Sequence, residues 1–371
     1  MLSHLGPFVW GRASRLARCL AYLVVLSAVI GCERQDYRER GRKKLENGGQ
    51  IVLVGPSRED PQWPGICGGA LRFMAGVPTV RVECVVPEKD TVQSMRELLE
   101  AQLAREPAAI CVYVTPEDVA EPTALRANLD RIARAQVLLV TMGCNPNDPR
   151  VYGHVNVDLE GGAELLGSSV ERLAADRRSY VLVHEDGADQ LASAVYARFA
   201  SGIRHQHATD WHLLEAVNTA ERGNTPADAV VELLKTFPHV GVVVTLNPKP
   251  WLDTPPGWIQ DLRGLNARFQ FATLTTSPAL WGRLGTPALP GTALALVGPL
   301  DGDIGYAAVD LVVQALVSER EAVPRRTIPC EVVTAETLVD FARRYAESAN
   351  GLDVMPYLGG ALPVTTSPAG G

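Results

Sequence analysis

Short apolar, β-branched runs alternate with helix-like stretches along the chain from residue 51 onward. We interpret ten of these runs as strands, at residues 51–54, 80–86, 109–114, 137–141, 154–157, 180–183, 240–245, 268–274, 293–297 and 328–333. Between them, apolar residues recur three and four positions apart, as at Leu98, Leu99 and Leu103. Strands that are apolar throughout and separated by helices form parallel sheets covered on both faces. The pattern therefore predicts an α/β fold.

Ten strands are more than one sheet comfortably holds, so we expect two doubly wound parallel-sheet lobes joined by a hinge. Open α/β sheets bind ligands at the carboxyl ends of their strands. Two such lobes that face each other would enclose a ligand site between them.

The N-terminus has the order of features found in export signals. Three arginines within the first 18 residues precede an apolar run over residues 20–30, which is too short to span a bilayer. The run leads into Val-Ile-Gly-Cys, which resembles the lipobox of bacterial lipoprotein signal peptides. The resemblance implies removal of residues 1–31 and acylation of Cys32, which would hold the mature chain on a membrane. The alternative is an uncleaved signal anchor with an incidental cysteine.

Residues 33–49 are charged, lack periodic apolar positions and close on Gly-Gly. Such a segment cannot bury enough surface to fold, so residues 32–49 are expected to comprise the lipidated cysteine and a flexible tether. At the other end of the chain, we expect residues 349–371 to form a disordered tail.

Charge and cysteine content limit the partners and the chemistry. The formal net charge of -7 argues against nucleic acid as a partner, because a phosphate backbone is bound by basic patches. No run of 18 apolar residues follows Cys32, so we expect the mature domain to be soluble. We also expect it to be a monomer. Five cysteines follow Cys32, in no CxxC spacing, and at least one must stay unpaired. Cys111 lies in an apolar run and is expected to be a small core residue.

Residues 154–173, HVNVDLEGGAELLGSSVERL, place an aspartate at a strand end before a Gly-Gly helix start. Residues 295–316 are ALVGPLDGDIGYAAVDLVVQAL. The two segments resemble the lobe crossings of periplasmic sugar-binding proteins of the ribose-binding type, and the second is similar to the family's return crossing. The order of elements from residue 51 to residue 345 also agrees. The resemblance implies a type I periplasmic-binding-protein fold that closes around a small ligand by hinge motion.

The resemblance also sets the expected lobe boundaries. Lobe 1 should comprise residues 50–157 and 299–322, and lobe 2 should comprise residues 158–298 and 323–348.

The expected ligand site is formed by loops at the strand ends of both lobes. Trp63 and Trp251 can stack on a ring, while Arg58 and Lys249 can reach an anion or a hydroxyl group. The other candidate ligand contacts are Asp60, Gln62, Asp158, Glu185, Asp186 and Asn247. The alternative is that these are solvated loop residues and that each tryptophan packs on a helix.

Two aspartate motifs have structural explanations beside the functional ones. Asp158 is expected to be a hinge or helix N-cap residue, because a carboxylate accepts hydrogen bonds from the free N–H groups of a first turn. The Asp-Gly-Asp sequence at residues 301–303 could hold a cation weakly but is better explained as a turn and helix start.

One histidine cluster raises the question of a metal. It consists of His205, His207 and His212 together with Asp210. Its polar surroundings favour a solvated edge strand, and structural metal sites use four closed ligands, so we expect no metal site.

Enzyme signatures are absent: there is no GxSxG elbow, phosphate-binding loop or HExxH motif, so we expect neither catalytic residues nor a cofactor. We predict a membrane-anchored solute-binding lipoprotein, on the outer side of a bacterial membrane, that captures a small polar, sugar-like ligand for an ABC permease or a sensor kinase. One alternative is a structural or signalling lipoprotein whose degenerate cleft binds a protein partner. The family's Asp-Arg pair is replaced by Met142-Gly143-Cys144, which favours this alternative. An exported enzyme on the same frame is a further alternative.

Overall fold

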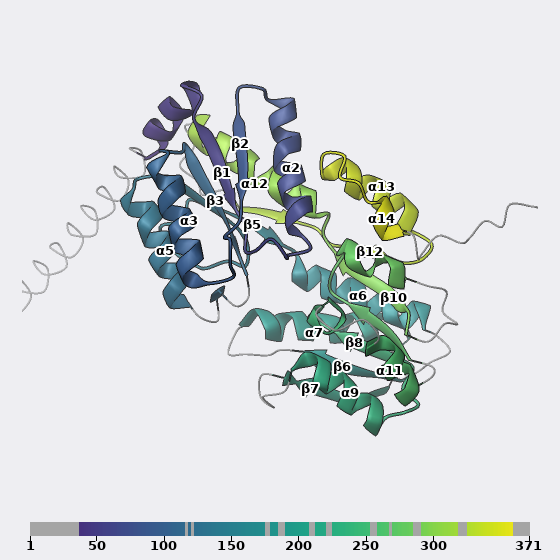
Figure 1. Ribbon diagram of the computed structural model, residues 1–371. Helices are drawn as coiled ribbons and strands as arrows, with labels where there is room; N and C mark the ends of the chain where they lie inside the picture. The colour runs from purple at the N-terminus through teal and green to yellow at the C-terminus, as the bar shows by residue number, and fades with distance from the viewer. Residues whose placement is uncertain are drawn as a thin grey trace, which may run out of the picture.

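The computed structural model contains two α/β lobes, each built around one six-stranded sheet (Figure 1). The structure describes residues 37–115, 118–119, 122–174, 179–184, 190–207, 212–219, 225–252, 258–266, 269–284, 291–317 and 325–358. The predicted fold class is confirmed. Within these ranges, no helix is long and apolar enough to cross a membrane.

The sheet of lobe 1 has the strand order β11-β5-β4-β3-β1-β2, and every strand pair is parallel. Its strands are β1 (Gln50–Val54), β2 (Arg81–Val85), β3 (Ala109–Val114), β4 (Leu138–Gly143), β5 (Gly153–Val157) and β11 (Arg325–Ile328). The central strands are buried on both faces, which explains why their sequences are apolar throughout.

The sheet of lobe 2 has the order β12-β10-β9-β8-β6-β7, in which only β12 runs antiparallel, on the edge beside β10. Its strands are β6 (Ser179–His184), β7 (His212–Asn218), β8 (Val242–Thr245), β9 (Gln270–Thr273), β10 (Ala293–Gly298) and β12 (Glu331–Val333). The edge strand β7 is exposed over its first residues, and it begins at His212, later than the edge strand expected around the histidine cluster.

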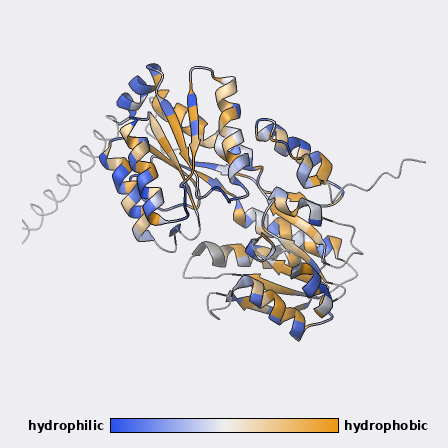
Figure 2. Ribbon diagram, in the orientation of Figure 1, coloured by the Kyte–Doolittle hydropathy of each residue, from blue (hydrophilic) through white to orange (hydrophobic). Residues whose placement is uncertain are grey.

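Helices cover both faces of each sheet. In lobe 1, α2 (Trp63–Gly76) and α12 (Asp301–Val317) cover one face, while α3 (Val92–Ala104) and α5 (Pro122–Arg134) cover the other. Figure 2 shows hydrophilic residues on the outer sides of α3 and α5 and hydrophobic residues along the strands beneath them. Burial of these apolar faces holds the lobe together.

Lobe 2 has the same layered arrangement. The helices α6 (Leu159–Leu173) and α7 (Gln190–His207) share one core cluster with the sheet. The elements on the other face are α9 (Pro226–Thr236), α10 (Lys249–Leu252), α11 (Trp258–Leu265), the 3₁₀ helix η1 (Pro278–Arg283), α13 (Leu338–Ser348) and α14 (Met355–Leu358).

The chain passes between the lobes three times, after β5, after β10 and after β11. The predicted strand at residues 328–333 is in fact two strands in different sheets. Pro329 lies between them and, because it lacks an N–H group, cannot continue a strand ladder. Lobe 2 therefore resumes after Ile328, and the boundary predicted at residue 323 is wrong.

Part of the predicted tether is folded. Residues 37–46 form a helix on lobe 1, where the Arg38 Nε donates to the carbonyl oxygen of Ala315 over 2.8 Å. A Cβ on Gly41 would lie 2.6 Å from Leu316. This helix was not predicted because its contacts are made by a glycine and Leu45, whereas a packed helix is recognised in a sequence by a periodic apolar stripe.

The segment predicted as a disordered tail is also structured in its first part. Residues 349–358 continue from α13 through α14, and Val354 and Leu358 are buried in the lobe 2 core.

Glycines let α2, α12 and α13 approach at backbone distance. A Cβ on Gly69 of α2 would lie 1.7 Å from the carbonyl oxygen of Gly302 in α12, and one on Gly305 would lie 1.8 Å from that of Ile66. One on Gly68 would lie 2.2 Å from the carbonyl oxygen of Ala349, directly after α13. Figure 1 shows α13 beside α2, although the apolar residues of α13 belong to the lobe 2 core. These helices therefore join the two lobes on one side.

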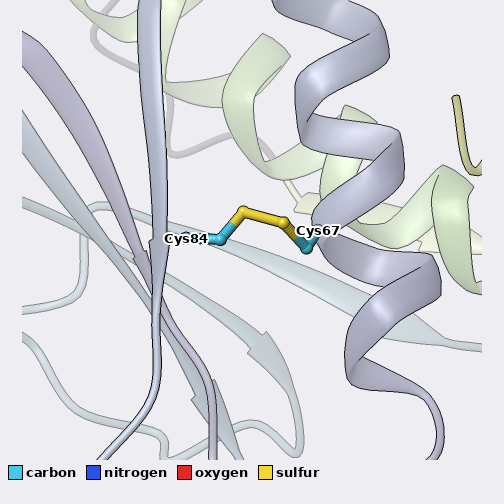
Figure 3. Close-up of a disulfide and its surroundings, with 2 residues drawn as sticks. All are labelled: Cys67 and Cys84. Atoms are coloured by element: carbon cyan, nitrogen blue, oxygen red, sulfur yellow. A yellow bond between two sulfur atoms is a disulfide. The ribbon is translucent and has the colours of Figure 1, made fainter.

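A disulfide links Cys67 in α2 to Cys84 in β2, with a Cα–Cα distance of 5.9 Å (Figure 3). By the chain-entropy model, closing a loop of this length stabilises a fold by about 3 kcal/mol. Cys111 is fully buried, as predicted, and burial raises the pKa of its thiol.

Candidate functional site

The carboxyl ends of both sheets face the region between the lobes. The chain leaves lobe 1 at the carboxyl end of β5 and leaves lobe 2 at the carboxyl end of β10. Because the other strands, apart from β12, run parallel to these two, their ends and the loops after them point the same way. This is the position at which open α/β sheets bind ligands.

Four side chains from both lobes meet at the second crossing. The Gln62 Nε2 donates to Asp301 Oδ1 over 3.3 Å, and the Tyr345 hydroxyl donates to Asp301 Oδ2 over 2.6 Å. The Tyr113 hydroxyl donates to Gln62 Oε1 over 3.3 Å. We call Gln62, Tyr113, Asp301 and Tyr345 the hinge cluster. It connects the start of α2 and the end of β3 in lobe 1 with α13, through the first residue of α12.

Asp301 is fully buried. Burial above all, and the nearby Asp60 carboxylate, raise its pKa to about 7, while hydrogen bonds from Tyr345 and Gln62 act to lower it. Burial, together with the charge of Asp301, also raises the pKa of Tyr345. The cluster therefore holds a carboxyl group that can change its charge near neutral pH.

The loop after β1 carries three of the predicted contacts. Asp60 Oδ1 accepts the backbone N–H groups of Gln62, at 2.8 Å, and Trp63, at 3.1 Å, and so ties the loop to the start of α2. Arg58 is exposed on the same loop. Gln62 lies in the hinge cluster, so the structure brings this part of the prediction together with Asp301.

Trp63 lies at the start of α2 and is only 8% exposed. A Cβ on Gly55 would lie 2.5 Å from its indole ring, so the loop fits closely over it. Its remaining surface lines a pocket of about 370 Å³ beside the disulfide, formed by Pro64, Cys67, Gly68, Leu71, Cys84 and residues 349–352. This pocket includes no strand-end loop of lobe 2, and Trp63 belongs to lobe 1's core.

Trp251 is a core residue of lobe 2. It stacks on Phe271 with ring centroids 3.9 Å apart, and its indole N–H donates to Thr245 Oγ1 over 2.7 Å. The structure therefore agrees with the alternative explanation for both tryptophans, which is packing, and we no longer count them as candidates for ring stacking.

Asp158 caps α6 as predicted, because its Oδ1 accepts the Gly161 N–H over 2.9 Å. Asn247 Oδ1 accepts the backbone N–H of Lys249 over 2.9 Å, in the loop after β8. The Lys249 side chain is exposed there. Asn247 and Lys249 thus lie at a strand end of lobe 2.

Several predicted residues lie outside the described part of the chain. They are Cys32, Glu185, Asp186 and Asp210. His205 and His207 belong to the last turns of α7, and His212 begins β7. Within the described ranges, no three His, Cys, Asp or Glu side chains are arranged to hold a metal ion.

The sequence prediction missed Tyr113, Asp301 and Tyr345 as a group. Tyr113 lies in an apolar strand, and Asp301 is 44 positions from Tyr345 and 239 from Gln62. A buried polar loop after β9 was missed as well. There, Thr276 Oγ1 donates to the Pro299 carbonyl over 2.6 Å, and the buried Ser277 Oγ has no hydrogen-bond partner among the described residues.

The fold and the strand-end loops define a two-lobed binding protein whose chain crosses three times between parallel sheets. A family model described as the periplasmic binding protein domain matches residues 51–320. The chain therefore belongs to the periplasmic binding protein family, and it has the type I fold that the sequence predicted. A search of curated protein sequences found no match.

Solved structures agree on the fold. An arabinose-binding protein from Geobacillus stearothermophilus is 15% identical, with a TM-score of 0.64, covering 79% of this chain and 99% of that one. An ABC transporter solute-binding protein from Agrobacterium vitis with bound α-D-tagatopyranose is 16% identical (TM-score 0.59; 80% and 98% covered). A putative LacI transcriptional regulator from Bacteroides fragilis is 12% identical (TM-score 0.58; 79% and 99% covered). At these identities the likeness establishes the fold alone.

Proposed function

We propose that this protein is an exported, lipid-anchored solute-binding protein that captures a small, uncharged polar ligand, such as a sugar or polyol, between its lobes. The observation that carries the proposal is the hinge cluster at the place where the carboxyl ends of both sheets meet. The Gln62 amide and the Tyr113 hydroxyl in this cluster suit the hydroxyl groups of a polyol. Similar folds that bind tagatopyranose and myo-inositol support this ligand class.

The proposed ligand contacts come from both lobes. Gln62 and Tyr113 provide the inner hydrogen-bonding groups, and the exposed Arg58 and Lys249 lie at strand ends of the two lobes. Asp60 and Asn247 lie in the loops after β1 and β8, and Glu185 and Asp186 follow β6. Lobe closure follows because a ligand that contacts both lobes only in the closed state shifts the population toward that state.

Thermal unfolding measured against a panel of sugars, polyols, nucleosides and small acids tests the proposal. The protein should begin at residue 33, so that the helix at residues 37–46 stays intact. A ligand at one hundred times its Kd stabilises by about 2.7 kcal/mol. Tyr113→Phe and Gln62→Leu should lose most of that shift. Val317→Ser, at the far end of α12, is the control and should keep it.

The proposed location rests on three features. The export signal precedes Cys32, the family is extracytoplasmic, and the Cys67–Cys84 disulfide is a bond that persists in oxidising compartments. We expect Cys32→Ala to move the protein from the membrane fraction to the soluble fraction of disrupted cells. Membrane retention of that variant would argue for the uncleaved signal anchor instead.

The partner is proposed to be an ABC permease or a sensor kinase, with the binding protein itself a monomer. A second function is favoured by one observation: Asp60, Asp158 and Asn247 all accept hydrogen bonds from backbone N–H groups two or three positions further along the chain. A cleft whose polar side chains serve the fold in this way suits a signalling lipoprotein that binds a protein partner. No thermal shift across the whole panel would favour that function.

A further inference from the structure

In the hinge cluster, one carboxyl group, that of Asp301, accepts hydrogen bonds from residues of both lobes. Asp301 begins α12 directly after the second crossing, and Gln62 reaches it from the start of α2. Tyr345 reaches it from α13, whose Phe341 and Ala342 lie in the lobe 2 core. A change in the charge of Asp301 therefore acts at the joint between the lobes.

In the arrangement observed, hydrogen bonds run from Tyr113 through Gln62 to Asp301, and Tyr345 donates to Asp301 separately. Tyr113 donates to the Gln62 carbonyl oxygen, the Gln62 amide donates to one carboxyl oxygen, and Tyr345 donates to the other. A carboxylate accepts only, so this pattern suits the ionised form of Asp301.

A neutral carboxyl group must donate one hydrogen bond. Tyr345 already donates to Oδ2, so the partner for a proton on Oδ1 is Gln62. Gln62 can accept it by rotating its amide half a turn, which places Oε1 toward Asp301 and Nε2 toward Tyr113. The Tyr113 hydroxyl then accepts from Gln62 instead of donating to it. One proton on Asp301 thus reverses a hydrogen bond at the end of β3.

The surrounding charges make this protonation accessible. Asp60 on the loop before α2 is the carboxylate that faces Asp301. Burial of Asp301, together with the negative charge of Asp60, raises the pKa of Asp301 to about 7. Tyr345 on α13 contributes a hydroxyl group, which donates to Asp301. The cation on α2, Arg72, pairs instead with Asp303 on α12, at 2.9 Å. No ion pair to Asp301 occurs among the described residues.

We propose that Asp301 is a proton-linked switch: protonation rotates the Gln62 amide and releases the Tyr113 O–H to donate to a ligand, whereas ionisation turns Tyr113 back toward Gln62. The proposal rests on the proposed function in placing the ligand at Tyr113. It predicts that ligand affinity changes between pH 5.5 and pH 8.5 through a residue that the ligand does not touch.

Amide NMR tests the switch without any ligand. The Gln62 side-chain NH₂ signal, assigned by its loss in Gln62→Leu, should show a nuclear Overhauser contact to the Tyr113 ring at pH 5.5 and lose it at pH 8.5. Asp301→Asn mimics the neutral acid, because its amide donates to Gln62 and its oxygen accepts from Tyr345. This variant should keep the acid pattern at both pH values. A Gln62 signal that is identical at both pH values in the wild-type protein overturns the switch.

Unfolding in urea supplies a check on the titration itself. The pKa of Asp301 is higher in the folded than in the unfolded chain, so the folded state binds the extra proton between about pH 4 and pH 7. Relative to Asp301→Asn, the wild-type folding constant should fall by up to about tenfold per pH unit across that window and level off above it. If the folding constants of the wild-type protein and Asp301→Asn change with pH in the same way, the proposal is overturned.

Binding of L-arabinose, D-tagatose and myo-inositol, measured by calorimetry at pH 5.5 and pH 8.5, tests the link to the site. Wild-type affinity should change with pH, while Asp301→Asn should bind equally at both pH values. Equal wild-type affinity at both pH values, beside a titrating Gln62 signal, overturns the link but leaves the proposed function standing. If none of the three binds at either pH, the proposed function fails for this ligand class, and the Gln62 signal still decides whether the switch exists.

Discussion

Replacing Gly305 with alanine is expected to destabilise the protein by about 3 kcal/mol or more, measured by urea unfolding. The added Cβ would lie 1.8 Å from the carbonyl oxygen of Ile66 and 3.1 Å from the backbone nitrogen of Ala70. Both atoms belong to the backbone of α2, so no side chain can move aside. Instead, α12 must separate from α2 and open the core between them.

Gly76→Ala is the matched control, because a Cβ there meets no atom within 4 Å at the end of α2. It should leave the free energy of unfolding unchanged or raise it slightly, since alanine favours a helix over glycine by about 1 kcal/mol. Equal losses in the two variants would show that the Gly305 effect is not caused by helix contact.

The second large effect is expected at Trp281, the largest fully buried side chain among the residues that the structure describes. Its ring meets Tyr345 and Phe341 edge-on, with centroids 5.2 Å and 6.0 Å away, and its N–H donates to the Thr276 carbonyl over 3.0 Å. Trp281→Ala should cost about 3–5 kcal/mol in unfolding free energy, because it removes these contacts and leaves a cavity.

Trp258→Ala provides the comparison for Trp281. Trp258 is only partly buried and meets Trp251 edge-on, so its loss should be clearly smaller. The Trp281 variant should also loosen α13, which carries Tyr345 to Asp301. A Trp281→Ala protein as stable as Trp258→Ala would contradict the view that this ring anchors α13.

The layered fold could be predicted from the sequence because parallel strands buried on both faces leave a continuous apolar signature. The short runs at residues 51–54 and 109–114 became β1 and β3 with nearly the same ends. This apolar pattern does not indicate which strands pair when they are far apart in the sequence. The split at Pro329 into strands of two different sheets was therefore missed. The same limit hid the helix at residues 37–46, whose contacts are with the end of α12.

The site was harder to predict for a physical reason. A tryptophan or an aspartate near a strand end suits a ligand contact and a structural contact equally well in sequence. The structure assigns Trp251 to the core and Asp158 to a helix cap. Asp301 was explained as a turn and helix start, yet its burial depends on Tyr345 and Gln62, which only the folded chain brings near.

The packed helix at residues 37–46 restricts how far an anchored molecule can reach. From Cys32 to Tyr37 there are five peptide units, which span at most about 18 Å when fully extended. That helix docks at the end of α12 and the start of β3, on the side of lobe 1 opposite the strand-end loops. In a protein anchored to a membrane through Cys32, the strand-end loops that form the proposed ligand site would therefore face away from that membrane.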